Sequence, residues 1–168
     1  MKLKTVGDLF RALGANDVRY LVAGGLAVVA HGYLRFTADI DLIIDMDRKN
    51  LLAAMDVFKS FGYRPRAPVV LEAFADAGKR EQCIGEKGRT VFSLWSPDHP
   101  ATEIVLFMKE PLIFEDAYRR RMPFMLIKGV EVTVIGLDDL IALKKLAGRP
   151  RDLQDIEKLN ALREKEDA

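Results

Sequence analysis

Apolar residues recur at intervals of three and four positions in two stretches near the N-terminus. This spacing predicts amphipathic helices over residues 5–13 and 49–61, each with a polar face toward solvent. Between them, short apolar runs predict strands over residues 18–22 and 37–45, separated by a short helix over residues 26–33. The first third of the chain therefore alternates between helices and strands.

Apolar segments bounded by glycine and proline continue through the rest of the chain. They predict neighbouring strands over residues 90–95 and 102–108, a hairpin of residues 124–127 and 131–135, helices over residues 69–77, 111–121, 137–147 and 151–164, and a turn over residues 85–88. We expect an α+β (mixed α/β) fold with a mixed central β-sheet flanked by helices. Residues 1–136 would form the core, and residues 137–168 a C-terminal helical pair packed on it within one compact domain.

Composition supports one domain with a core of its own, since 49% of the 168 residues are hydrophobic and 30% are charged. The formal net charge of +1 excludes a globally basic nucleic-acid-binding protein, although a local basic face stays open. The single cysteine, Cys83, suits a reducing compartment. The chain lacks the apolar stretch of a signal peptide, and its longest uncharged run, residues 20–34, is too short to span a membrane. We expect a cytoplasmic protein without a membrane segment.

Two aspartates stand in the apolar run RFTADIDLIID, which predicts the strand over residues 37–45. Asp39 and Asp41 point to the same face of a strand, with their α-carbons about 6.6 Å apart. At an effective dielectric near 20 their charges repel by roughly 2–3 kcal/mol. A divalent cation between the two carboxylates would remove this repulsion, and Mg²⁺ is often held by one or two carboxylates together with substrate phosphates. The alternative is that both aspartates lie on a solvated strand face.

A pair of glycines, Gly24 and Gly25, stands between the first predicted strand and the following helix. Backbone N–H groups at such a turn can face an anion, and the lack of side chains lets a phosphate approach closely. The alternative is a tight strand–helix turn that needs a positive φ. A phosphate-binding turn followed by a strand with paired carboxylates predicts a metal–nucleotide site.

The stretch AGG(x)9-RFTADIDL resembles the signature of the DNA polymerase β-type nucleotidyltransferase superfamily, in which a hydrophobic-Gly-[Gly/Ser] turn precedes a Dx[D/E] strand. The Arg-x-Thr ahead of DID is similar to a bacterial subgroup of toxin-like nucleotidyltransferases from abortive-infection and toxin–antitoxin systems. LIALKKLAGRPRDLQDIEKL resembles the closing helices of that subgroup, with their K-x-x-A-x-R-x-[K/R]-D-x-x-D pattern. The resemblance covers residues 18–46 and 138–159, whereas residues 62–125 match only by strand order.

The resemblance implies three acidic ligands for two Mg²⁺ or Mn²⁺ ions, the third on an adjacent strand. Asp39, Asp41 and Glu103 match these positions and would be the catalytic and metal-binding residues. The superfamily more often has aspartate at the third position, so Glu103 is a departure from its pattern. The alternative for Glu103 is a solvent-facing residue at the start of its strand.

The resemblance also implies nucleotide contacts for residues around this strand and in the late motif. Gly24 and Gly25 would bind the β and γ phosphates, and Arg35, Thr37 and Lys144 would contact the nucleotide. An arginine offers a phosphate two parallel hydrogen bonds, and a threonine hydroxyl offers one. The alternatives are a solvent-facing Arg35, an ordinary strand Thr37, and a helix junction in which Asp152 and Asp155 pair with Lys144 and Arg149. For the late motif we expect Lys144 to face substrate and the Arg149–Asp152 pair to be structural.

The reaction so implied is metal-dependent transfer of NMP from an NTP such as ATP to an acceptor hydroxyl, with release of pyrophosphate. The acceptor stays open among tRNA, protein and small molecules, and an antitoxin or a second copy of the chain is a candidate partner. One alternative is a non-catalytic relative that binds nucleotide or a partner through the same site. Another is an RNA-binding module that uses the basic run Arg119–Arg121.

Overall fold

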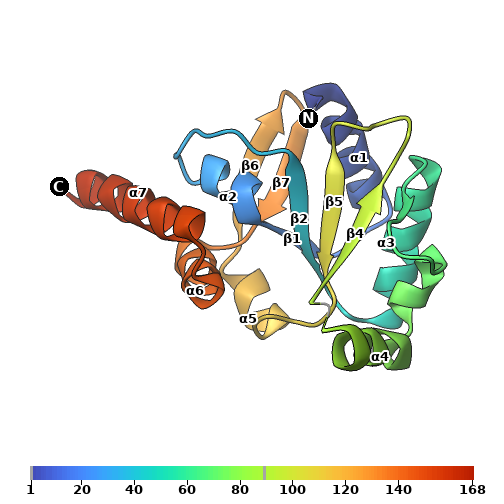
Figure 1. The fold of residues 1–168 in the computed structure, drawn as a ribbon. Coiled ribbons are helices and arrows are strands. Elements are labelled where there is room, and N and C mark those ends of the chain that lie inside the picture. The colour runs from blue at the N-terminus through green and yellow to red at the C-terminus, as the bar shows by residue number, and fades with distance from the viewer. Residues whose placement is uncertain (1, 89) are drawn as a thin grey trace.

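A mixed β-sheet of seven described strands lies at the centre of the protein in a computed structural model (Figure 1). The structure describes residues 2–88 and 90–168, so Met1 and Arg89 of the predicted core lie outside it. The strands are β1 (Tyr20–Ala23), β2 (Asp39–Ile44), β3 (Arg64–Pro65), β4 (Val91–Trp95), β5 (Glu103–Phe107), β6 (Met122–Ile127) and β7 (Val130–Val134). The helices are α1 (Leu3–Ala15), α2 (Gly24–Ala30), α3 (Arg48–Ser60), the 3₁₀ helix η1 (Leu71–Ala75), α4 (Ala77–Lys87), α5 (Phe114–Arg119), α6 (Leu137–Ala147) and α7 (Pro150–Asp167).

The strand order β3-β4-β5-β2-β1-β7-β6 confirms the predicted mixed sheet. Strand β2 runs antiparallel to β1 and parallel to β5, so the DxD strand lies in the middle of the sheet. The predicted neighbours β4 and β5 pair antiparallel, as do the hairpin strands β6 and β7. The β2–β5 register places Asp39 opposite Glu103 and Asp41 opposite Val105.

Helices lie on both faces of this sheet, with α1 and α3 on one side and α2 on the other, while α6 packs beside α2 and α7 extends away from the sheet (Figure 1). The alternate residues Ile40, Leu42 and Ile44 of β2 are fully buried, as are Leu9 and Leu13 of α1. This alternation leaves the intervening positions of β2, which hold the aspartates, on the opposite face. Helix α6 contacts both α2 and α7, while the boundary predicted after residue 136 stays a prediction.

The C-terminal helices begin and end at residues suited to those positions. Helix α6 ends before Gly148, which has a φ of +61° and so takes the left-handed conformation that glycine tolerates best. Helix α7 starts at Pro150, and Asp152 accepts a hydrogen bond from the backbone N–H of Arg149 at 3.2 Å. None of the helices among residues 2–88 and 90–168 is long and apolar enough to cross a membrane.

The sequence prediction was least accurate between the third helix and β4. The predicted helix over residues 69–77 is the shorter η1, and the predicted turn at residues 85–88 is wrong because its first three residues end α4. Only Gly88, with a φ of +58°, leaves the helix. Helix α4 contains two glycines and many charged residues, so its periodicity is weak, whereas the short edge strand β3 has too few residues to form a pattern.

Candidate active site

The three predicted metal ligands lie on one face of the sheet, on the adjacent strands β2 and β5. Asp39 and Asp41 are two residues apart on β2, and the register sets Glu103 directly beside Asp39. Asp39 is exposed, while Asp41 and Glu103 are partly buried. The fold therefore brings together residues that are far apart in the sequence.

Gly24, at the β1–α2 junction, lies against the Asp41 side chain. Its φ of +58° disfavours any other residue, and a Cβ built on it would overlap the Asp41 carboxylate. This overlap gives a steric reason for glycine at this position. The helix α2 begins at Gly24, two residues earlier than predicted, and ends at Ala30.

Gly25 makes room for the two side chains that precede β2. A Cβ on Gly25 would lie 2.5 Å from Thr37 Oγ1 and 3.1 Å from Arg35 Nη1. The Thr37 hydroxyl donates to the backbone oxygen of Asp39 at 3.3 Å, so it helps to position the start of β2. Gly25 thus lets the predicted nucleotide-binding residues Arg35 and Thr37 pack closely against α2.

Burial and the neighbouring charge of Asp39 disfavour the ionised form of the Asp41 carboxylate. Burial, and next the charge of Asp39, raise the pKa of Asp41 above its usual value of 3.8, although Lys144, Arg149 and the backbone N–H of Gly25 act in the opposite direction. A cation between Asp39 and Asp41 would relieve this cost, so the donor chemistry of the pair fits a divalent ion.

A buried ion-pair network connects α6 and α7 to the segment before β2. The Nζ of Lys144 lies 2.7 Å from Asp155 Oδ2 and 3.2 Å from Asp152 Oδ1. Arg35 Nη2 donates to Asp155 Oδ2 at 2.9 Å, and its Nε lies 2.8 Å from Oδ1 without the alignment of a hydrogen bond. The Asp155 side chain is only 1% exposed, and its contacts with Arg35 and Lys144 hold both of these side chains in place.

Arg149 and Asp152 form the predicted structural pair at the start of α7. Arg149 Nε donates to Asp152 Oδ2 at 2.7 Å. Burial alone would raise the pKa of Asp152, but the hydrogen bonds from Arg149 and Lys144 outweigh it, so the net shift is downward. The Arg149 side chain is 76% exposed and lines the cleft, whereas Lys144 is 6% exposed and held by carboxylates. The alternative of a salt-bridged helix junction therefore describes the contacts of all four residues of the late motif.

Glu103 is engaged by a residue that the sequence did not single out. Arg66 Nε donates to Glu103 Oε1 at 2.8 Å, and Arg66 Nη2 donates to Oε2 at 3.1 Å. Among the described residues, no three side chains of His, Cys, Asp or Glu gather closely enough to hold a metal ion. The roles of Asp39, Asp41 and Glu103 as metal ligands therefore stay predictions.

A cleft of about 910 Å³ opens over this face of the sheet. Its polar part contains the predicted site residues, together with Arg149, Arg151 and Asp152. Its apolar part combines residues of β4, β5 and α6 with Pro111 from the segment after β5: Val91, Val105, Phe107, Pro111, Leu140, Leu143 and Leu146. The carboxylates lie where the two parts meet, since Asp41 pairs with Val105 in the sheet.

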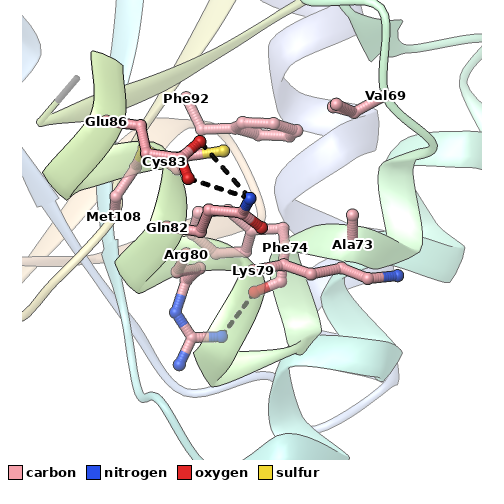
Figure 2. Close-up of a pocket in the computed structure, with 10 residues that line it drawn as sticks. All are labelled: Val69, Ala73, Phe74, Lys79, Arg80, Gln82, Cys83, Glu86, Phe92 and Met108. Atoms are coloured by element: carbon pink, nitrogen blue, oxygen red, sulfur yellow. Dashed lines mark hydrogen bonds between the residues drawn. The ribbon is translucent and has the colours of Figure 1, made fainter. Parts of the chain in front are cut away.

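A second cavity, of about 240 Å³, lies at η1 and α4 (Figure 2). The rings of Phe74 and Phe92, with centroids 5.2 Å apart, form part of its wall, and the Cys83 side chain lies near Gln82 and Glu86. Phe92 belongs to the buried side of β4, so this cavity is on the face of the sheet opposite the aspartates. None of its described lining residues is a predicted site residue.

The sequence model of a family described as nucleotidyltransferases of unknown function (DUF6036) matches residues 1–165. The chain belongs to this family. The family supports an enzymatic role and confirms the nucleotidyltransferase part of the resemblance, while the toxin-like subgroup stays a prediction. A comparison with curated proteins gives no sequence match.

The chain is similar in fold to the lincosamide antibiotic adenylyltransferase LnuA, whose crystal structure contains lincomycin. The two share 12% sequence identity with a TM-score of 0.61, and the alignment covers 94% of this chain and 95% of LnuA. At this identity the likeness shows the fold alone, and it confirms the predicted nucleotidyltransferase fold over nearly the whole chain.

Proposed function

We propose that the protein transfers NMP from an NTP, such as ATP, to a hydroxyl group of an acceptor and releases pyrophosphate. The observation that carries the proposal is the pair Asp39 and Asp41 on one strand face, packed against Gly24 and facing a cleft. The acceptor oxygen would form a bond to the α-phosphorus and release its proton to solvent. The bond from the α-phosphorus to the oxygen that bridges the α and β phosphates would break, and its electron pair would leave with pyrophosphate.

Asp39 and Asp41 would hold Mg²⁺ or Mn²⁺, and Glu103 would join them if it left Arg66. Bound divalent ions in such sites lower the pKa of an attacking hydroxyl and neutralise charge on the phosphates. The raised pKa of Asp41, caused first by burial and then by Asp39, supports a cation site at the pair. Whether one ion or two bind stays a prediction of the resemblance.

The cationic side chains of the cleft would bind the triphosphate. Arg149 and Arg151 line the cleft with exposed side chains, and Arg35 and Lys144 are fixed behind them by Asp155. Arg35 can therefore act only from the place that Asp155 gives it, and Lys144 contributes its charge beside Asp41. Gly24 and Gly25 would let the phosphates approach the backbone, and Thr37 would position Asp39.

The acceptor that the cleft favours is a small molecule with an apolar face. The apolar residues of β4, β5 and α6 begin directly beside the carboxylates, and Leu146 is 80% exposed there. Two of the three arginines in the basic run proposed for RNA have partners within the chain, because Arg120 pairs with Asp139 through two hydrogen bonds and Arg121 lies over the Tyr118 ring. The antibiotic acted on by LnuA is one example of a small acceptor. An antitoxin or a second copy of the chain, and a cytoplasmic location, stay proposals without such support.

One observation favours the alternative of a non-catalytic relative, namely the Arg66–Glu103 ion pair, which occupies the carboxylate predicted as third ligand.

The proposal is tested by incubating the protein with Mg²⁺ or Mn²⁺, each α-³²P-labelled NTP, and separate fractions of small metabolites, total RNA and protein. We expect label on a molecule of the metabolite fraction, and none with the Asp39→Ala/Asp41→Ala variant. Nucleotide binding without label transfer in any fraction would favour the non-catalytic relative.

A further inference from the structure

Arg66 reaches the carboxylates from the β3 edge of the sheet. It follows the short edge strand β3, and its backbone N–H donates to the Ser93 oxygen of β4 at 3.0 Å. Its side chain extends past β4 to Glu103 on β5, where its Nε and Nη2 bind the two carboxylate oxygens. The backbone of Arg66 is thus fixed to the sheet, while its guanidinium reaches the site.

The place that Arg66 occupies is defined by the β2–β5 register. Glu103 pairs with Asp39, so a cation bound by Glu103 also lies close to Asp39. The Arg66 guanidinium therefore neutralises the charge of Glu103, which lies beside Asp39 in the sheet.

We propose that Arg66 competes with a divalent cation for the Glu103 carboxylate, so that Arg66 sets the metal affinity of the site. The inference rests on the proposed function, because it concerns the same carboxylates. A guanidinium that binds both oxygens of a carboxylate leaves little room for a second cation on them. Glu103 can contribute to metal binding only when Arg66 moves away.

The exposure of the pair makes such competition feasible. The side chains of Arg66 and Glu103 are 57% and 28% exposed, and ion pairs this accessible to water are weak. A divalent ion already held by Asp39 and Asp41 would therefore be able to displace the guanidinium. The backbone hydrogen bond to Ser93 keeps Arg66 beside the site after displacement, so the competition is reversible.

The test is Mn²⁺ binding to the protein without nucleotide, measured by titration calorimetry and by the electron paramagnetic resonance signal of free Mn²⁺. We expect Arg66→Gln to tighten Mn²⁺ binding about fivefold, the ratio expected when an exposed ion pair no longer competes. The matched control is Arg64→Gln, which removes the same charge from β3, two residues before Arg66. Arg64 lies over the Trp95 ring, with its guanidinium carbon 5.1 Å from the ring centre, so we expect no change.

The Glu103→Gln background decides whether the effect passes through Glu103. Competition predicts that Arg66→Gln has no effect on Mn²⁺ affinity once Glu103 is replaced. Equal affinity of wild type and Arg66→Gln, or a gain that persists in the Glu103→Gln background, would overturn the proposal. Circular dichroism of each variant verifies that the fold is retained.

Asp41→Asn separates failure of this inference from failure of the proposed function. Loss of Mn²⁺ binding in Asp41→Asn, together with unchanged binding in Arg66→Gln, would overturn the competition and leave the metal site in place. An Mn²⁺ affinity that is the same in wild type and Asp41→Asn would contradict the metal site itself, and therefore also the competition.

Discussion

The Asp41 carboxylate occupies the space that a side chain on Gly24 would need. The first residue of α2 and the central strand of the sheet therefore approach each other only because Gly24 has no Cβ. The contact joins the two parts of the sequence motif, the glycine pair and the DxD strand, into one structural unit. Substitutions on either side of this contact have separable effects.

Gly24→Ala should strongly reduce both stability and NMP transfer. The substitution forces alanine into a φ of +58° and against the Asp41 carboxylate, so we expect a loss of about 2–3 kcal/mol in the free energy of unfolding and at least a tenfold loss of transfer. Gly14→Ala in α1 is the matched control, since nothing lies within 4 Å of its added Cβ. Urea denaturation should find that control unchanged or slightly stabilised. A Gly24→Ala variant as active as wild type would contradict the steric role.

Asp155→Ala should destabilise the junction between α6, α7 and the segment before β2. The substitution leaves the buried Lys144 with one carboxylate partner, Asp152, and removes the carboxylate partner of Arg35. Breaking buried ion pairs costs about 3–5 kcal/mol. Asp138→Ala is the control, because Asp138 is 86% exposed and pairs only at the surface with Arg163. Thermal melting and urea denaturation measure both. A loss no larger than that of the control would mean that the network is not a stabilising one.

Asp41→Asn should stabilise the folded protein at neutral pH while abolishing transfer. Burial and the charge of Asp39 raise the pKa of Asp41 above 3.8, so the folded state binds this proton more tightly than the unfolded chain. Ionised Asp41 therefore costs stability above its folded pKa, and the cost vanishes as the pH falls toward 3.8.

The measurement is urea denaturation of both proteins from pH 7 to pH 4 in EDTA. We expect Asp41→Asn to be the more stable at pH 7 and the difference to shrink at lower pH. Asp138→Asn, at an exposed position, should follow wild type throughout. An Asp41→Asn variant that is less stable than wild type at pH 7 would contradict the electrostatic description.

The parts of the fold that the sequence predicted are those with local patterns. The helix over residues 137–147 is observed with the same limits, because its apolar spacing, its acidic first turn and the following Gly148 all agree. The DxD strand was predicted from its apolar run, and the two carboxylates within that run identified it as a candidate site. Helix α4 was missed because glycines and charges obscure its periodicity.

The contacts that organise the site could not be predicted, because they join residues distant in the sequence. Arg66 and Glu103 are 37 positions apart and meet only because the order β3-β4-β5 places the edge strand across the sheet. Arg35 and Asp155 are 120 positions apart. The acidic pattern of the late motif indicated ion pairs with Lys144 and Arg149, but only the fold shows that Asp155 also holds Arg35.

The central claim is that Asp39 and Asp41 are required for transfer of NMP, which contains the α-phosphate, from an NTP to the acceptor. The most direct measurement is a pair of reactions on the active acceptor fraction, one with α-³²P-labelled and one with γ-³²P-labelled NTP, each with wild type and Asp41→Asn. With wild type, we predict that the α label moves to the acceptor and that the γ label leaves only as pyrophosphate. With Asp41→Asn, we predict neither label transfer nor release of pyrophosphate. Label from the γ position on the acceptor, its release as inorganic phosphate, or transfer that persists in Asp41→Asn would contradict the claim.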